Sequence, residues 1–141
     1  NVPGIVGLGK AIDIAYKTID NYNEHLQSLR DYYISKVENE IPDAMLNGDR
    51  SNRLPGNANF SFKGVDGGDL LLKLDEKGIC ASTGSACNTG STAPSHVLVA
   101  IGTEMEYLQG SLRITFGKEN TKEDVDYLVN NLKQIVKECR K

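Results

Sequence analysis

The chain is organised around one stretch, Cys80-Ala-Ser-Thr-Gly-Ser-Ala-Cys87-Asn-Thr-Gly-Ser-Thr-Ala-Pro-Ser95. Gly84 and Gly90 bracket Cys87, and no large apolar residue lies within six positions on its N-terminal side. Such a segment has little apolar surface to offset the entropy of ordering, so we expect an exposed, mobile loop. A thiol on a loop of this kind is more often a reactive group than part of the packed core.

On the N-terminal side of this stretch, the apolar pattern predicts one long helix from about residue 3 to residue 40, before Pro42. A helix of this length spans roughly 50 Å, more than a compact domain of this size needs. Its start is rich in glycine (Gly4, Gly7, Gly9), so we expect the first half to pack against a further body. The second half is expected to lie on the domain's own sheet. The apolar positions that recur at helical spacing are Ile5, Leu8, Ile12, Ala15, Ile19, Leu26, Leu29, Tyr33 and Val37.

Short strands are expected at residues 44–47, 57–62, 79–81 and 111–116. The segments at 57–62 and 111–116 alternate polar and apolar residues, which is typical of strands with one wet face. Three shorter helices complete the chain: one capped by Asp66 and ending before Gly78, one that starts near Pro94 and ends at Gly102, and one that starts at a capping box of Thr121 and Asp124.

The predicted order of elements, α-β-β-α-β-α-β-α, indicates an α+β fold in two layers. A long N-terminal helix and the shorter helices pack on a small, mostly antiparallel sheet. Cys139 falls on the apolar stripe of the last helix, so we expect it to be a small buried hydrophobic residue.

The composition of the 141 residues limits the possible functions. A net charge of -3 argues against a nucleic-acid-binding surface, and no apolar run approaches the length of a membrane span. Three cysteines at irregular spacing, with only two histidines, indicate neither a disulfide framework nor a metal site. A reducing cytoplasm is the expected setting. Because the chain starts at Asn1, we expect it to be a processed product or a piece of a longer protein.

Two residues are candidates for chemistry. Cys87 could act as a nucleophile if its thiol is activated, with His96 and the helix start near Pro94 as weak candidates for the activating group. Arg113, on the polar side of its strand, could bind a carboxylate through two parallel hydrogen bonds. From the residues alone, Cys87 is equally well a loop residue without a role. For Arg113, a solvated charge is the more common reading of an arginine on an exposed strand face. Asn59, on the polar face of its strand, carries no signal by itself.

Four segments of the chain nevertheless resemble one family. Residues 78–87 resemble the active-site loop of the cysteine desulfurases of the nitrogen-fixation and iron–sulfur-cluster type, and residues 94–102 resemble the segment that follows that loop. Residues 110–117, Gly-Ser-Leu-Arg-Ile-Thr-Phe-Gly, are similar to the strand that bears the family's carboxylate-binding arginine. Residues 1–9 are similar to the start of the helix that joins the family's two domains.

This resemblance implies a class V aminotransferase of PLP fold type I. Pyridoxal 5'-phosphate acts as electron sink for L-cysteine. By this resemblance, Cys87 is expected to take the sulfur as a persulfide while L-alanine is released, and Arg113 to hold the substrate α-carboxylate. The resemblance also implies an iron–sulfur scaffold or another protein as the sulfur acceptor, and a homodimeric parent enzyme.

The resemblance also implies a missing part. The family's Schiff-base lysine lies in a Ser-x-His-Lys motif, and neither histidine here precedes a lysine. Residues 1–141 are therefore expected to be the C-terminal small domain alone, with residues 1–41 as the interdomain helix and 82–94 as the cysteine loop. No residue here is expected to bind the cofactor, and the isolated chain is expected to be inactive. Two alternatives stay open: a stand-alone sulfur-carrier or redox thiol module without the cofactor, and a degenerate homologue that acts only as a binding subunit.

Overall fold

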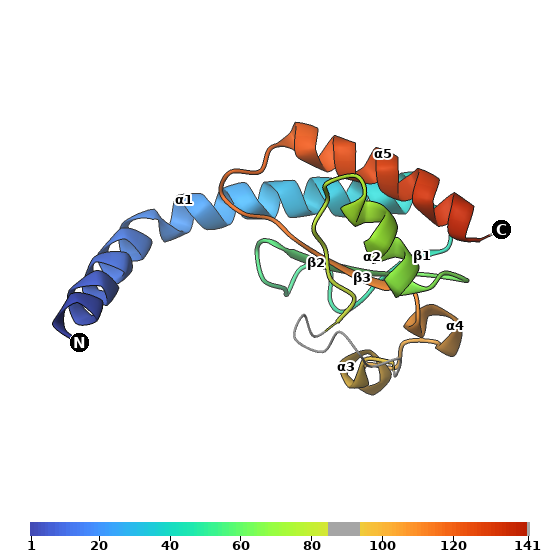
Figure 1. Cartoon of the computed structure of the whole chain (residues 1–141), viewed down its shortest axis with the longest axis horizontal. Coiled ribbons are helices and arrows are strands. Elements are labelled where there is room, and N and C mark those ends of the chain that lie inside the picture. The colour runs from blue at the N-terminus through green and yellow to red at the C-terminus, as the bar shows by residue number, and fades with distance from the viewer. Residues whose placement is uncertain (85–93, 141) are drawn as a thin grey trace.

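A computed structural model describes residues 1–84 and 94–140 of the chain. Its helices lie around a small sheet, and the longest helix extends well beyond the sheet (Figure 1). In chain order the elements are α1 (Val2–Glu40), β1 (Ala44–Leu46), β2 (Asn57–Phe62), α2 (Gly67–Asp75), α3 (His96–Ala100), α4 (Met105–Leu108), β3 (Ser111–Thr115) and α5 (Lys122–Cys139).

The sheet has three antiparallel strands in the order β1-β2-β3. β2 pairs with both neighbours, so that Phe60 lies opposite Leu46 on one side and Leu112 on the other. The predicted α+β fold with helices on a small antiparallel sheet is confirmed. The predicted strand at 57–62 has the observed bounds, and those at 44–47 and 111–116 each extend one residue too far.

Helices α1 and α5 run side by side over one face of the sheet (Figure 1). Alternate residues of β2 and β3 point into this layer, and Ala58, Phe60 and Phe62 are fully buried. The ring of Tyr33 from α1 meets Phe60 edge-on, with 5.8 Å between the ring centroids. Burial of aromatic rings and aliphatic side chains between two layers is the main source of stability in such a domain.

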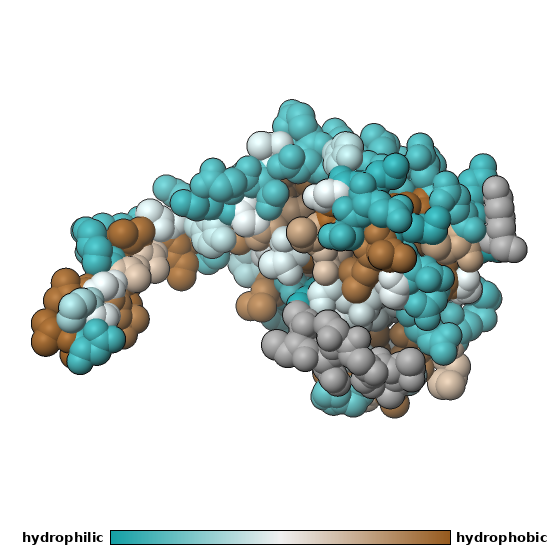
Figure 2. All heavy atoms as spheres, viewed as in Figure 1, coloured by the Kyte–Doolittle hydropathy of each residue, from teal (hydrophilic) through white to brown (hydrophobic). Residues whose placement is uncertain are grey.

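The two halves of α1 differ in burial. From Leu26 onward its apolar side chains lie in the core, whereas the first half projects away from the body of the molecule (Figures 1 and 2). Gly7 and Gly9 face open space, since a Cβ atom at either position would meet no atom within 4 Å. The large apolar side chains exposed on the projecting half are Val2, Ile5, Val6, Leu8, Ile12, Ile14, Tyr16, Ile19 and Tyr22.

The predicted caps are confirmed. The side chain of Asp66 accepts hydrogen bonds from the amides of Gly68 and Asp69 at the start of α2. Thr121 and Asp124 form the capping box of α5. Near the end of α5, Cys139 packs partly buried against the core, and burial raises the pKa of its thiol. A thiol with a raised pKa is a poor nucleophile at neutral pH, which agrees with the predicted structural role.

One prediction about a short element is wrong, and one short helix was not predicted. Residues 79–81 form no strand, because the amide of Ile79 donates to the carbonyl of Leu74 at the end of α2. Among residues 79–84, Ser82 alone pairs with β3. The four-residue helix α4 was not predicted, since it is too short to show a helical period. Within the described ranges, no helix is long and apolar enough to cross a membrane.

Candidate functional site

The face of the sheet opposite the core is polar. At the two ends of the β2–β3 ladder, the amide of Phe62 donates to the carbonyl of Gly110 (3.0 Å) and the amide of Phe116 donates to the carbonyl of Gly56 (2.9 Å). Every second residue pair between these two ends is hydrogen-bonded through the backbone. Asn59 and Arg113 lie directly opposite each other and fall between these pairs. They are therefore a non-hydrogen-bonded pair, the kind in which side chains come closest.

Arg113 is partly buried on this polar face. Its backbone amide donates to the carbonyl of Ser82 (2.6 Å) and its carbonyl accepts from the amide of Ser82 (3.2 Å). The side chain is different, because the guanidinium has no hydrogen-bond or ion-pair partner among residues 1–84 and 94–140. Both backbone groups of Arg113 are thus bonded to Ser82, on the side away from β2, while its guanidinium keeps its hydrogen-bonding capacity for a ligand.

The segment that leads to Cys87 is attached at this point. In addition to the Ser82 pairing, the hydroxyl of Ser111 donates to the carbonyl of Thr83 (3.0 Å). Gly67 at the start of α2 allows the close approach, because a Cβ atom there would lie 2.8 Å from Cγ2 of Thr83 and 2.9 Å from the carbonyl of Ser111. The main chain at residues 82–83 is therefore held beside Arg113.

A hydrogen-bonded group of polar side chains lies on the same face. Nδ2 of Asn47 donates to Oδ1 of Asn59 (2.6 Å) and to the hydroxyl of Ser61 (2.8 Å). Ser61 is fully buried and Asn47 is 8% exposed. Sequence reasoning missed this group. The alternation of 57–62 placed Asn59 and Ser61 on the polar face, but the partner Asn47 follows only from the register between β1 and β2.

The structure says less about the other residues considered from the sequence, Cys87, His96 and Cys80. Cys87 and most of the predicted loop at 82–94 lie outside the described residues. His96 is the exposed first residue of α3 and has no partner in the part of the chain that the structure describes. Cys80 is exposed. Within that part, no group of three His, Cys, Asp or Glu side chains could hold a metal ion.

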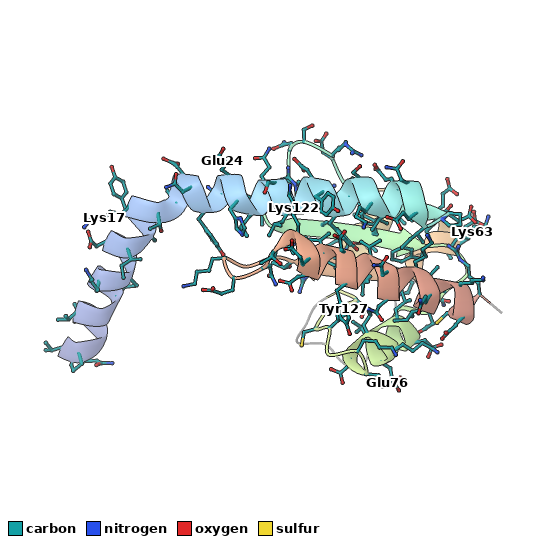
Figure 3. The ribbon with its side chains drawn as sticks, turned by 90° about the horizontal axis from the view of Figure 1, so that it is seen from above. Lys17, Glu24, Lys63, Glu76, Lys122 and Tyr127 are labelled. Atoms are coloured by element: carbon teal, nitrogen blue, oxygen red, sulfur yellow. The ribbon has the colours of Figure 1, made fainter. Side chains whose placement is uncertain are left out.

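The residues that the structure describes do not fit pyridoxal phosphate. A Schiff base needs a lysine inside an enclosed site, and every described lysine is at least partly exposed. Figure 3 shows Lys17 and Lys63 at the outer edge of the molecule. The described residues therefore supply a candidate anion-binding arginine and its support, but no cofactor site.

Comparisons with known proteins agree on one family. Residues 1–128 match the sequence model of the aminotransferase class-V family. The chain is 51% identical over 140 residues to cysteine desulfurase IscS of Dictyoglomus turgidum, covering 99% of this chain and 36% of that protein. It is 49% identical over 140 residues to cysteine desulfurase IscS of Methanosarcina thermophila, covering 99% of this chain and 34% of that protein. The chain thus spans about a third of the length of these curated relatives.

Solved structures show the same arrangement of helices and strands. A NifS-like protein superimposes with a TM-score of 0.81 at 32% identity, covering 97% of this chain and 34% of that one. A NifS-like protein from Rickettsia africae superimposes with a TM-score of 0.83 at 24% identity, over 97% of this chain and 35% of that one, which supports the fold alone. Sequence and fold together show that the chain belongs to the class-V aminotransferase family.

Proposed function

We propose that this chain is the small domain of a pyridoxal-phosphate-dependent cysteine desulfurase. In this proposal, the complete enzyme converts L-cysteine to L-alanine, Arg113 binds the α-carboxylate of the substrate, and Cys87 accepts the sulfur. The named relatives are cysteine desulfurases, and the chain matches them over nearly its whole length. A reducing cytoplasm is the setting in which a free acceptor thiol persists.

The observation that carries the proposal is the pairing of Ser82 with Arg113. It links two features that the sequence shows separately, the cysteine-bearing segment and the candidate carboxylate-binding arginine. Cys87 is five residues beyond Ser82, and five residues of chain span at most about 18 Å. Connectivity alone therefore keeps the thiol within reach of the region that Arg113 faces.

The guanidinium of Arg113, which has no partner among residues 1–84 and 94–140, suits a carboxylate ligand. Its planar fork can donate two parallel hydrogen bonds to two oxygens, which fixes the orientation of the ligand as well as its position. The backbone hydrogen bonds to Ser82 reduce the freedom of the arginine before the ligand binds. A preorganised site loses less entropy on binding than a mobile one.

The proposed reaction balances without an external oxidant. The bond between Cβ and sulfur of L-cysteine breaks, and a sulfur–sulfur bond forms at the thiol of Cys87. L-cysteine and one thiol give L-alanine and one persulfide, and the proton displaced from sulfur is returned to the carbon. Pyridoxal phosphate, bound by residues outside this chain, supplies the electron sink. The persulfide sulfur then passes to an iron–sulfur scaffold or another acceptor protein.

The exposed half of α1 supports a neighbouring domain. Its large apolar side chains would be an aggregation hazard on a free module, whereas a large domain would bury them. This argues against a stand-alone thiol carrier. We accordingly propose that the isolated chain is inactive, and that the complete enzyme contains a large cofactor-binding domain and forms a homodimer.

The test uses the full-length enzyme with the substitution Cys87→Ser and, as a matched control, Cys80→Ser, which alters the exposed cysteine seven residues earlier. Alanine and sulfide formed from L-cysteine are measured in the presence of a thiol reductant. Cys87→Ser is expected to abolish both products, and Cys80→Ser to leave both nearly unchanged. Undiminished sulfide release by Cys87→Ser would rule out Cys87 as the sulfur acceptor.

A further inference from the structure

Asn59 occupies the position on the polar face that is closest to Arg113. As a non-hydrogen-bonded pair, the two residues have Cβ atoms about 4.5 to 5.5 Å apart, and both side chains leave the sheet in the same direction. A group bound by one of these side chains therefore lies within reach of the other.

Asn47 sets the orientation of the Asn59 carboxamide. Nδ2 of Asn47 donates to Oδ1 of Asn59 (2.6 Å), and in this arrangement Oδ1 of Asn47 is buried without a partner among the described residues. Asn47 itself is fixed by its bond to Ser61, by donation from its backbone amide to the carbonyl of Asn59 (2.9 Å), and by the guanidinium of Arg53, which donates to its carbonyl (2.9 Å). With its oxygen engaged, the Asn59 side chain presents its NH2 group as the remaining polar atom.

That NH2 group has no acceptor within residues 1–84 and 94–140, and neither has the guanidinium of Arg113. Asn59 is partly exposed, so the group is open to a ligand. Two adjacent side chains thus offer only N–H donors, one of them with a positive charge. A ligand group with several acceptor oxygens and a negative charge, a carboxylate, matches both.

We propose that Asn59 donates a second hydrogen bond to the substrate carboxylate, beside Arg113, and that Asn47 is a positioning residue for Asn59. This inference rests on the proposed function, because it takes the ligand of Arg113 to be the α-carboxylate of the substrate. Arg113 supplies the charge, and Asn59 restricts the carboxylate from the side of β2.

The experiment compares Asn59→Ala with Asn57→Ala in the full-length holoenzyme. Asn57 is a matched control, because it is also partly exposed, lies on the same face of β2, and is opposite Thr115 instead of Arg113. Binding of L-alanine, which has the carboxylate, and of L-alaninamide, which lacks it, is measured by calorimetry. Asn59→Ala is expected to weaken L-alanine binding about 10-fold, the effect of one lost hydrogen bond to a charged group, and to leave L-alaninamide unaffected. Asn57→Ala is expected to change neither.

The substitution Asn59→Asp distinguishes a ligand-binding role of Asn59 from a purely structural one. Its carboxylate still accepts the hydrogen bond from Asn47, so a purely structural role would tolerate it, but it presents a negative charge to the ligand and to Arg113. We expect L-alanine binding to weaken about 100-fold, and KM for L-cysteine to rise more than kcat falls. Equal losses for both ligands with Asn59→Ala, or unaltered binding with Asn59→Asp, would overturn the inference.

The same measurements on Arg113→Ala distinguish the two levels of the proposal. If Arg113→Ala abolishes the preference for L-alanine and Asn59→Ala retains it, the inference about Asn59 is wrong and the proposed function stands. If neither substitution changes the preference, the carboxylate site itself is wrong and the proposed function fails with it. Thermal midpoints of all variants identify any that lose the fold.

Discussion

The two faces of the three-stranded sheet come from one alternating pattern but serve different purposes. On the core face, Phe60 and Leu112 lie opposite each other and are fully buried under α1 and α5. On the other face, one residue along each strand, Asn59 and Arg113 lie opposite each other and keep unused hydrogen-bond donors within the described residues. Phe60 and Leu112 thus belong to the core, whereas for Asn59 and Arg113 we propose a role in recognition, and substitutions can separate the two.

Arg113→Ala should give the largest effect, and it should leave stability intact. In the full-length enzyme we expect kcat/KM for L-cysteine to fall about 1000-fold, because two charge-assisted hydrogen bonds to the carboxylate are lost. Steady-state kinetics together with urea unfolding would check this. Arg113→Lys, which keeps the charge and loses the fork, should recover only part of the activity. A change in unfolding free energy above about 1 kcal/mol would place Arg113 with the core instead.

Phe60→Ala should give the opposite result on the core face. Truncation of a buried phenylalanine costs about 3 kcal/mol or more, from lost burial and the cavity left between Tyr33 and Phe62. Urea unfolding of the chain measures this loss. The carboxylate preference of the folded enzyme should be unaltered, and a lost preference would show that the two faces are not independent.

Tyr33→Phe tests the core face from the side of α1. The ring of Tyr33 is fully buried, but its hydroxyl has no hydrogen-bond partner within the described chain, and burial raises its pKa. Because a buried unpaired hydroxyl is destabilising, removing it should leave stability unchanged or raise it by about 1 kcal/mol. Calorimetric unfolding provides the measurement, with Tyr32→Phe as control, since the Tyr32 hydroxyl donates to Asp126 (2.7 Å). A clear loss of stability on Tyr33→Phe would reveal a partner for the hydroxyl.

The smallest effect is expected at the contact between α1 and α5. Hydrogen bonds from Lys36 and Tyr32 lower the pKa of Asp126 in the folded protein. The stabilisation is therefore present above the carboxyl's unfolded pKa of about 4 and is lost as the pH falls through the lower folded value. Asp126→Asn should lose less stability than the unaltered chain between about pH 5 and pH 2. Parallel unfolding curves across that range would contradict this account of the contact.

Much of the core face could be predicted from sequence, because local periodicity determines it. The alternation at 57–62 predicted the buried Ala58, Phe60 and Phe62, although Ser61 on the polar face is buried as well. The helical stripe of α5 predicted the buried residues of that helix. The polar face could be predicted only in part. Arg113 and Asn59 were placed on the correct side of their strands, but the register that puts them opposite each other is a long-range property. The same holds for Asn47 and for the attachment of Ser82.

The measurement that tests the account most directly is the location of sulfur after the full-length enzyme meets L-cysteine. The enzyme is alkylated, digested and analysed by mass spectrometry, with fragment spectra that separate Cys80 from Cys87, since no lysine or arginine lies between them. The account predicts one additional sulfur atom on Cys87 and none on Cys80 or Cys139. Additional sulfur on either of those two, or alanine formation with no sulfur on Cys87, would contradict it.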